Sequence, residues 1–172
     1  HFATMHLVTL KSGPLFLVDT LINRNLSAES LVDISVLAAE KVRCFGLQPN
    51  IALISFSDFG SDDAESSCEA RRAVALLHER YPDLSVDGEM QIQTALQLAQ
   101  RDAKYPQNKL KGKQVNVLVF PRLSAANACY QLLKAVGNAD EVVGPIQVGL
   151  ARPIYFADHD ASVKDIVNIT AM

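Results

Sequence analysis

The sequence predicts an α/β fold, in which a mostly parallel β-sheet lies between two layers of helices in a three-layer α/β/α arrangement. Apolar residues repeat first with strand-like and then with helix-like spacing, several times along the 172 residues, which is the pattern of alternating strands and helices. Residues 51–55 form a nearly continuous apolar run, typical of a strand buried on both faces of a parallel sheet. A hydrophobic fraction of 49% and a charged fraction of 20% indicate a folded globular protein.

The first predicted elements are a hairpin and a helix. Apolar residues 5–10 and 15–19 flank a turn at residues 11–14, so we expect two paired strands that add an antiparallel edge to the sheet. Ser27 has the position of an N-cap, and apolar residues then repeat at helical spacing until Gly46. Glycine is the residue type that most often follows the end of a helix.

The same two periodicities predict the remaining elements. We expect Pro82 to end one of the helices and Ser124 to cap another. In chain order, these elements are a strand at 51–55, a helix at 66–80, a strand at 84–86, a helix at 92–103, a strand at 115–120, a helix at 124–136, a strand at 142–150 and a helix at 162–172.

Loops that follow the strands are the candidate binding regions, because ligands of parallel sheets lie beyond the carboxyl ends of the strands. The prediction therefore nominates four loops, at residues 19–25, 55–61, 120–124 and 149–162. Loop 55–61 reads Ser-Phe-Ser-Asp-Phe-Gly-Ser and precedes a helix, so its hydroxyl and backbone N–H groups suit a phosphate or a carbonyl oxygen.

An exposed polar turn is the alternative for loop 55–61. The carboxylates of Asp62, Asp63 and Glu65 favour that alternative for anionic ligands, because their charge repels a phosphate.

Three groups of charged residues have both a functional and a structural interpretation. His159, between Asp158 and Asp160, has the composition of a general base with orienting carboxylates, or of solvated charge in an exposed loop. Arg152 follows a strand and could clamp a phosphate or form a structural ion pair. A lysine cluster could contact polyphosphate or remain a solvated surface; it comprises Lys104, Lys109, Lys111 and Lys113.

Composition argues against several classes of partner. A net charge of −3 gives no general attraction to nucleic acid. No apolar run approaches the roughly 18 residues of a membrane helix, and the first residues lack the features of a signal peptide, so we expect a cytoplasmic protein. Three distant cysteines and four scattered histidines predict neither a disulfide framework nor a metal site. The ends of the chain suggest a piece of a longer protein.

An ordered set of motifs resembles the phosphate acetyl/butyryltransferase family. The variant Gly-Glu-Met-Gln at residues 88–91 resembles the phosphotransacetylase-like C-terminal region of bacterial multimodular NADP-dependent malic enzymes, whereas free-standing phosphotransacetylases usually carry Gly-Pro-Leu-Gln. The motifs are Val86–Gln91, Thr94–Leu96, Leu110–Gly112, Val115–Pro121, Ala125–Asn127, Gly144–Ile146, Gly149–Pro153 and Ser162–Asn168.

The resemblance implies a fold, a ligand and a set of site residues. It implies an isocitrate/isopropylmalate dehydrogenase-like fold, in which residues 1–172 are the C-terminal portion of a larger two-subdomain unit and of a homo-oligomer. Acetyl-CoA is the implied effector, while NADP and a divalent metal are implied only for a domain nearer the N-terminus. The residues implied for the acetyl-CoA or phosphate cleft are Ser57, Gly60, Ser61, Asn127, Arg152 and Asp165.

The departures from the family pattern bear on activity. Asp158 and His159 stand where phosphotransacetylases have a serine and an arginine implicated in acyl transfer, while the family aspartate is present as Asp165. Losing a hydroxyl and a permanent cation removes a phosphate clamp and adds repulsion.

Three functions follow as hypotheses. The first is a regulatory and oligomerisation domain of a malic enzyme, which binds acetyl-CoA and lacks acyltransferase activity. The second is an active phosphate acetyltransferase in which Asp165 assists thiol deprotonation. The third is a domain that serves oligomerisation alone.

Overall fold

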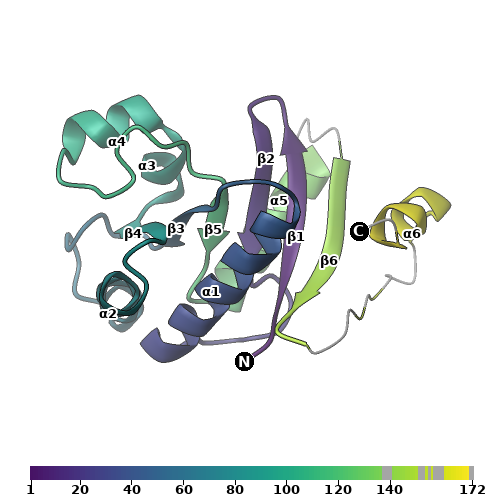
Figure 1. Cartoon of the computed structure of the whole chain (residues 1–172), viewed down its shortest axis with the longest axis horizontal. Helices are drawn as coiled ribbons and strands as arrows, with labels where there is room; N and C mark the ends of the chain where they lie inside the picture. Colours follow the sequence, from purple (N-terminus) through teal and green to yellow (C-terminus); the bar gives the residue numbers. More distant parts are fainter. Residues whose placement is uncertain (137–140, 151–153, 155, 157–160, 171–172) are drawn as a thin grey trace.

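A computed structural model describes residues 1–136, 141–150, 154, 156 and 161–170 of the chain. Six strands form one sheet in the order β4-β3-β5-β2-β1-β6, with helices on both faces (Figure 1). The strands are β1 (Ala3–Leu10), β2 (Gly13–Val18), β3 (Asn50–Ile54), β4 (Ser85–Met90), β5 (Val117–Val119) and β6 (Glu141–Val148). The helices are α1 (Ala28–Cys44), α2 (Glu65–Arg80), α3 (Ile92–Leu96), α4 (Leu98–Lys104), α5 (Leu123–Val136) and α6 (Val163–Thr170).

Parallel pairing dominates the sheet, as predicted. β5 pairs in parallel with both β2 and β3, and β3 pairs in parallel with β4. β1 is antiparallel to both of its neighbours, β2 and β6.

The prediction that the hairpin forms an edge is wrong. β1 lies between β2 and β6, so the hairpin is inside the sheet. The first four residues of β1, Ala3 to His6, are all buried, as an internal strand covered on both faces requires.

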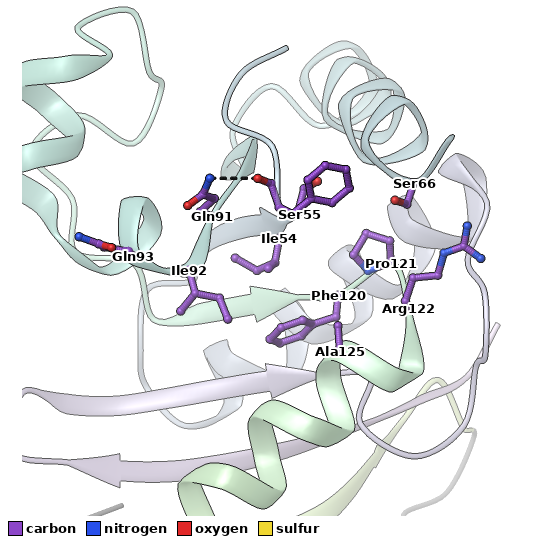
Figure 2. Close-up of a pocket in the computed structure, with 11 residues that line it drawn as sticks. Ile54, Ser55, Ser66, Gln91, Ile92, Gln93, Phe120, Pro121, Arg122 and Ala125 are labelled. Carbon is purple, nitrogen blue, oxygen red and sulfur yellow. Dashed lines mark hydrogen bonds between the residues drawn. The ribbon is translucent and has the colours of Figure 1, made fainter. Parts of the chain in front are cut away.

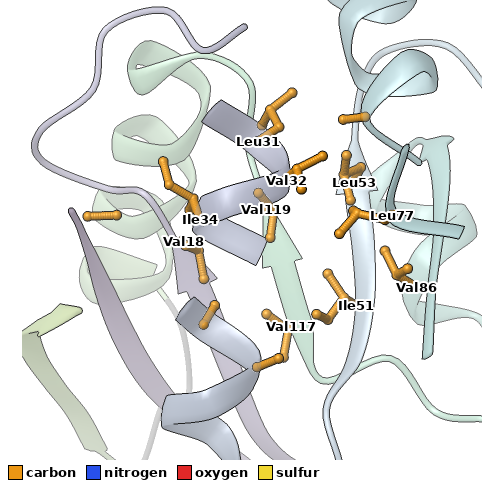
Figure 3. Close-up of a cluster of buried hydrophobic side chains, with 14 of the residues drawn as sticks. Val18, Leu31, Val32, Ile34, Ile51, Leu53, Leu77, Val86, Val117 and Val119 are labelled. Atoms are coloured by element: carbon orange, nitrogen blue, oxygen red, sulfur yellow. The ribbon is translucent and has the colours of Figure 1, made fainter. Parts of the chain in front are cut away.

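Two apolar clusters hold the layers together. One lies between the sheet and helices α1 and α2, where Leu31 and Ile34 of α1 pack with Leu53 and Val119 of the sheet (Figure 3). The other joins the opposite face to α3 and α5 through Ala95, Ala126 and Tyr130. The predicted three-layer α/β/α arrangement is therefore confirmed.

Helix α1 has the ends that its sequence predicts. The Ser27 side chain accepts a hydrogen bond from the backbone N–H of Ser30, which makes it the N-cap. Gly46, just after the last turn, has φ +73, a conformation that favours glycine.

Several boundaries differ from the prediction. β4 continues to Met90 because Asp87 and Glu89, which predict a loop by their polarity, are buried with hydrogen-bond partners. Ser124 is the second residue of α5 and therefore does not cap it.

The predicted helix at 92–103 is divided at Gln97 into α3 and α4. The buried guanidinium of Arg101 donates to the Ala95 carbonyl at 2.9 Å, an oxygen that a continuous helix would pair with a backbone N–H. In the part of the chain that the structure describes, no helix has the length and apolar character needed to cross a membrane.

Candidate functional site

A cleft opens where β3, β4 and β5 end. The chain leaves β3 towards α2, on one face of the sheet, and leaves β5 towards α5, on the other face. Neighbouring parallel strands whose connections diverge in this way leave a crevice between them, which is where ligands of α/β sheets bind. The cavity here has a volume of about 440 Å³, within the range typical of small-molecule sites.

Most of the cleft wall is apolar. In the view of Figure 2, Ile54, Ile92 and Phe120 lie between two polar ends, one with Gln91 and Gln93 and the other with Ser66 and Arg122. The complete lining consists of Ile54, Ser55, Phe56, Ser66, Gln91, Ile92, Gln93, Phe120, Pro121, Arg122 and Ala125.

Hydrogen bonds fix the loop that forms one wall. The Ser55 and Ser67 hydroxyl oxygens are 2.9 Å apart, which ties the end of β3 to the first turn of α2. Gln91 donates its side-chain N–H to the Phe56 carbonyl at 2.9 Å, and its backbone N–H to Asp58 at 2.9 Å. The wall is therefore held in place before any ligand arrives.

Arg122 brings positive charge to the cleft, and two of its five N–H donors already have acceptors. It donates to Asn25 Oδ1 at 2.6 Å and to Glu65 Oε2 at 3.4 Å. The side chain of Glu65 is 86% exposed, so this ion pair lies at the surface and contributes little to stability.

A buried carboxylate lies beneath the loop that follows β3. Glu89 has no exposed surface, and its Oε1 accepts hydrogen bonds from the Ser57 hydroxyl at 2.8 Å and the Gly60 N–H at 2.7 Å. Its Oε2 lies 3.8 Å from Arg71 Nε and has no hydrogen-bond partner. The Cys68 sulfur and the charge of Glu89 both raise the pKa of Arg71.

Comparison with known proteins assigns the family. Residues 1–172 match the model of the family described as Phosphate acetyl/butaryl transferase. The chain belongs to this family. Its likeness to solved family structures is close: TM-scores are 0.90 with the EutD phosphotransacetylase from Staphylococcus aureus and 0.88 with a phosphotransacetylase from Streptococcus pyogenes, at 29% and 30% identity. In both cases 99% of this chain aligns with 52% of the other, which supports the predicted isocitrate dehydrogenase-like fold.

Curated relatives include both malic enzymes and acetyltransferases. The chain is 42% identical over 168 residues to the NADP-dependent malic enzyme of Escherichia coli (strain K12), covering 98% of this chain and 22% of that protein. It is 42% identical over 149 residues to the phosphate acetyltransferase of Treponema pallidum (strain Nichols), covering 85% of this chain and 44% of that protein. The chain thus corresponds to the C-terminal part of the malic enzymes and spans less than half of that acetyltransferase.

The structure brings three of the residues implied by the family together. Ser57 and Ser61 have their hydroxyl oxygens 3.2 Å apart, and Ser57 shares the Glu89 carboxylate with Gly60. This group, Ser57, Gly60 and Ser61, lies beside the cleft, not on its lining. The sequence gives no indication of Glu89 as their shared acceptor, because its polarity predicts a loop.

Of the other three implied residues, Asn127 is the one whose side chain the structure describes. Asn127, in α5, donates to the Thr20 carbonyl at 3.4 Å and so joins α5 to the loop after β2. Arg152 lies outside the described residues, as do Asp158 and His159. Asp165 lies in α6, and the structure describes its backbone but not its side chain.

A smaller polar cleft borders the first. It has a volume of about 200 Å³ and shares Gln91 and Gln93 with the apolar cleft. Lys104 lies here, with its Nζ 5.0 Å from the centre of the Tyr105 ring. Of the lysine cluster, Lys113 instead donates to the Ser85 hydroxyl at 2.8 Å, a structural contact. Among the described residues, no three His, Cys, Asp or Glu side chains gather as metal ligands would.

Proposed function

We propose that this family member is the regulatory and oligomerisation domain of a cytoplasmic NADP-dependent malic enzyme. Its role is to bind acetyl-CoA as an allosteric effector, without transferring the acetyl group to phosphate. Oxidative decarboxylation of malate to pyruvate, with its NADP and divalent metal, is assigned to the N-terminal part of the longer protein. Identity of 42% to a malic enzyme over 98% of this chain supports that assignment.

One observation carries the loss of phosphate chemistry. Of the described residues that line the cleft, only Arg122 is a cation, and it directs one N–H to Asn25 and another to the carboxylate of Glu65, whose negative charge partly offsets it. Transfer to phosphate needs free positive charge at the anion. Asp158 and His159 replace the family serine and arginine and point to the same conclusion.

The test uses the intact protein. We expect calorimetry to detect acetyl-CoA binding, and NADPH formation from malate to fall when acetyl-CoA is added. Where acetyl-CoA lowers the affinity for malate, linkage requires malate to lower the affinity for acetyl-CoA by the same factor. Arg152→Ala should abolish the inhibition. The absence of acetyl-CoA binding, or inhibition unchanged in Arg152→Ala, contradicts the proposal.

An active phosphate acetyltransferase is the second candidate. The 42% identity to an enzyme of that name and the family aspartate at Asp165 favour it. In this reaction acetyl-CoA and phosphate give acetyl phosphate and CoA, and in the reverse direction Asp165 would accept the proton of the CoA thiol. Release of CoA from acetyl-CoA only when phosphate is present, followed with a thiol reagent, distinguishes this enzyme from the regulatory domain.

Oligomerisation without ligand binding is the third and simplest alternative. If the domain joins subunits, deleting residues 1–172 from the intact protein should divide the oligomer into smaller particles. The mass of each particle should then fall by more than the mass of the deleted residues. Light scattering after gel filtration measures this. A truncated protein that forms smaller particles but responds normally to acetyl-CoA favours the assembly role alone.

A further inference from the structure

A second cavity lies at the opposite end of the sheet from the cleft described above. β2 and β3 both run parallel to β5, so the amino ends of these three strands lie together there. This amino-end cavity has a volume of about 470 Å³, within the range typical of small-molecule sites. Asn50 lines it and Ile54 lines the cleft, so the length of β3 places the two about 13 Å apart at about 3.3 Å per residue.

Segments that are distant in the sequence build the walls of the amino-end cavity. They are the β1–β2 turn, the segment between α1 and β3, the end of α3 and the segment that leads into β5. Gln114 donates its side-chain N–H to the Leu96 carbonyl at 3.2 Å, which ties the last two of these segments together. Most of the wall is apolar and favours an apolar ligand; its apolar residues are Leu10, Pro14, Leu15, Leu47, Leu96 and Val115.

Hydrogen bonds fix the polar part of the wall. The Asn50 backbone N–H donates to Asn116 Oδ1 at 2.8 Å, which joins the start of β3 to the segment before β5. Asn50 Nδ2 donates to the Gln114 carbonyl at 2.9 Å, and Asn116 Nδ2 donates to the Gln48 carbonyl at 2.9 Å. Each of these side-chain nitrogens therefore already has an acceptor.

The side-chain oxygen of Asn50 has no such partner. Asn50 Oδ1 is buried, and none of the described residues donates a hydrogen bond to it. The amide cannot be turned over to remedy this, because the Gln114 carbonyl only accepts and must face the nitrogen. An unpaired buried acceptor costs about 1–3 kcal/mol. A ligand that presents an N–H or O–H to Asn50 would supply the missing donor.

The charges at this end of the sheet favour an uncharged ligand. Of the described residues that line the amino-end cavity, none has an ionisable side chain. Lys113, next to the lining residue Gln114, donates to the Ser85 hydroxyl at 2.8 Å, and Lys11 is exposed in the β1–β2 turn. A charged ligand would lose hydration here without gaining an ion pair from the wall.

We infer that the amino-end cavity binds a small, uncharged and mostly apolar molecule that donates one hydrogen bond to Asn50 Oδ1. Indoles and phenols have this chemistry. The site lies at the other end of β3 from the cleft, so the inference is independent of the proposed regulatory function and of acetyl-CoA.

Three related probes test the chemistry of the site: indole, 1-methylindole and indole-3-carboxylate. Saturation-transfer NMR on the intact protein gives a Kd for each. We expect indole to bind, and 1-methylindole, which lacks the N–H donor, to bind about fivefold more weakly. Indole-3-carboxylate should bind at least about tenfold more weakly, because its charge must be desolvated.

Two tryptophan substitutions test the location. Ser12→Trp and Gln114→Trp fill the amino-end cavity from different segments of its wall, and both positions are exposed, so we expect normal folding. Each should weaken indole binding by about tenfold or more. Lys11→Trp, beside Ser12 in the same turn but outside the lining, is the matched control and should bind indole like the parent. Ala125→Leu fills the other cleft and should also bind indole normally.

The outcomes separate the parts of the inference. Failure of the parent protein to bind indole overturns the site, and equal binding of indole and 1-methylindole overturns the hydrogen bond to Asn50. Indole-3-carboxylate binding as tightly as indole overturns the preference for an uncharged ligand. Parent affinity for indole in both tryptophan variants, or a loss found only in Ala125→Leu, overturns the location.

Discussion

Glu89 illustrates how one buried side chain organises the loop beside the cleft. Its carboxylate accepts from Ser57 and from Gly60, and the backbone oxygen of the same residue accepts the N–H of Phe59 at 2.8 Å. Buried carboxylates are costly unless they are paired and hydrogen-bonded, and here the partners all come from the loop and from α2. The conformation of the loop therefore depends on the Glu89 carboxylate as its shared acceptor.

Glu89→Ala should lower the free energy of unfolding by about 3 kcal/mol, because it leaves the buried Ser57 hydroxyl, the partly buried Gly60 N–H and part of the Arg71 charge without an acceptor. Glu89→Gln keeps an acceptor oxygen for Ser57 and Gly60 and should cost less. Urea denaturation measures both values. Glu40→Ala, at an exposed position of α1, is the control and should change stability little. Equal losses in Glu89→Ala and Glu40→Ala would contradict the role given to Glu89.

His6 is a second buried residue whose properties depend strongly on its surroundings. It is 2% exposed, its Nδ1 lies 2.7 Å from the Thr20 hydroxyl, and its ring stacks on Tyr130 with centroids 4.0 Å apart. Burial lowers the pKa of His6 from 6.5 to about 4, and the charge of Lys134 acts in the same direction. His6 is therefore neutral in the folded protein at neutral pH.

This pKa predicts a loss of stability in acid. Between pH 6.5 and about 4 the unfolded chain binds a proton at His6 that the folded chain does not. The stability contributed by neutral His6 is complete above pH 6.5 and declines as pH falls through this window, by about 3 kcal/mol in total. His6→Phe, which keeps a ring against Tyr130, should flatten this part of the pH profile.

Urea unfolding at a series of pH values tests the His6 prediction. The ring-proton shift of His6, followed by NMR, gives the pKa directly. A measured pKa near 6.5 would contradict the burial effect.

At the scale of elements, the sequence predicts the end of one helix correctly and the end of another wrongly. Ser27 and Ser124 both precede apolar periodic segments, and the sequence predicts both as N-caps. Only Ser27 accepts the backbone N–H of the first turn, whereas Ser124 lies within α5. Helix α5 begins one residue before Ser124, at Leu123, whose N–H donates to the Arg24 carbonyl at 3.2 Å.

The two serines therefore give a paired prediction. Ser27→Ala should destabilise the protein by about 1 kcal/mol, because it removes the acceptor for an unpaired helix N–H. Ser124→Ala should leave stability unchanged or raise it slightly, because alanine is the better helix former. Thermal unfolding of the two variants distinguishes them. A loss in Ser124→Ala as large as in Ser27→Ala would restore the capping role to Ser124.

Arg101 controls the arrangement of α3, α4 and the loop that follows them. Its fully buried guanidinium donates to three backbone carbonyls, those of Ala95, Leu110 and Lys113, at 2.8–2.9 Å. Arg101→Met should cost at least about 3 kcal/mol, because these oxygens lose a charged donor. Arg72→Met, an exposed position in α2, is the control. Chemical denaturation compares them, and a small effect at Arg101 would mean that other groups satisfy the carbonyls.

An element can be predicted from the sequence when the residues that determine it are neighbours in the chain. The cap and glycine of α1 and the apolar strand β3 are local patterns, and the structure confirms them. The division between α3 and α4 depends on Arg101 reaching residues up to 12 positions away, and no local period contains that information. The same holds for the place of the hairpin, because the pairing of β1 with β6 joins residues 3 and 148.

At the scale of the whole molecule, the candidate site is only partly visible in the sequence. The sequence nominates loops 55–61 and 120–124, and the structure places both at the cleft. It gives no sign that Gln91 and Gln93 join them, because this requires β4 to lie next to β3. Family motifs located the region, but the identity of the lining depended on the tertiary arrangement.

Ligand linkage gives a prediction for the intact protein. If acetyl-CoA binds the folded state alone, a concentration of 100 times its Kd should raise the free energy of unfolding by about 2.7 kcal/mol. Thermal unfolding with and without acetyl-CoA measures this as an upward shift in Tm. No shift at saturating acetyl-CoA would contradict the proposed regulatory role.

The position of β5 also has a consequence for the order of folding during synthesis. This strand, residues 117–119, separates the pair β1–β2 from the pair β3–β4, and it is the strand through which these two halves are joined. A ribosome must therefore translate the first four strands before the one that connects them exists. We expect the hairpin and the β3–α2–β4 unit to form first, with unpaired edges facing each other, and to associate when β5 emerges. Until that moment those edges are open to pairing with another nascent chain.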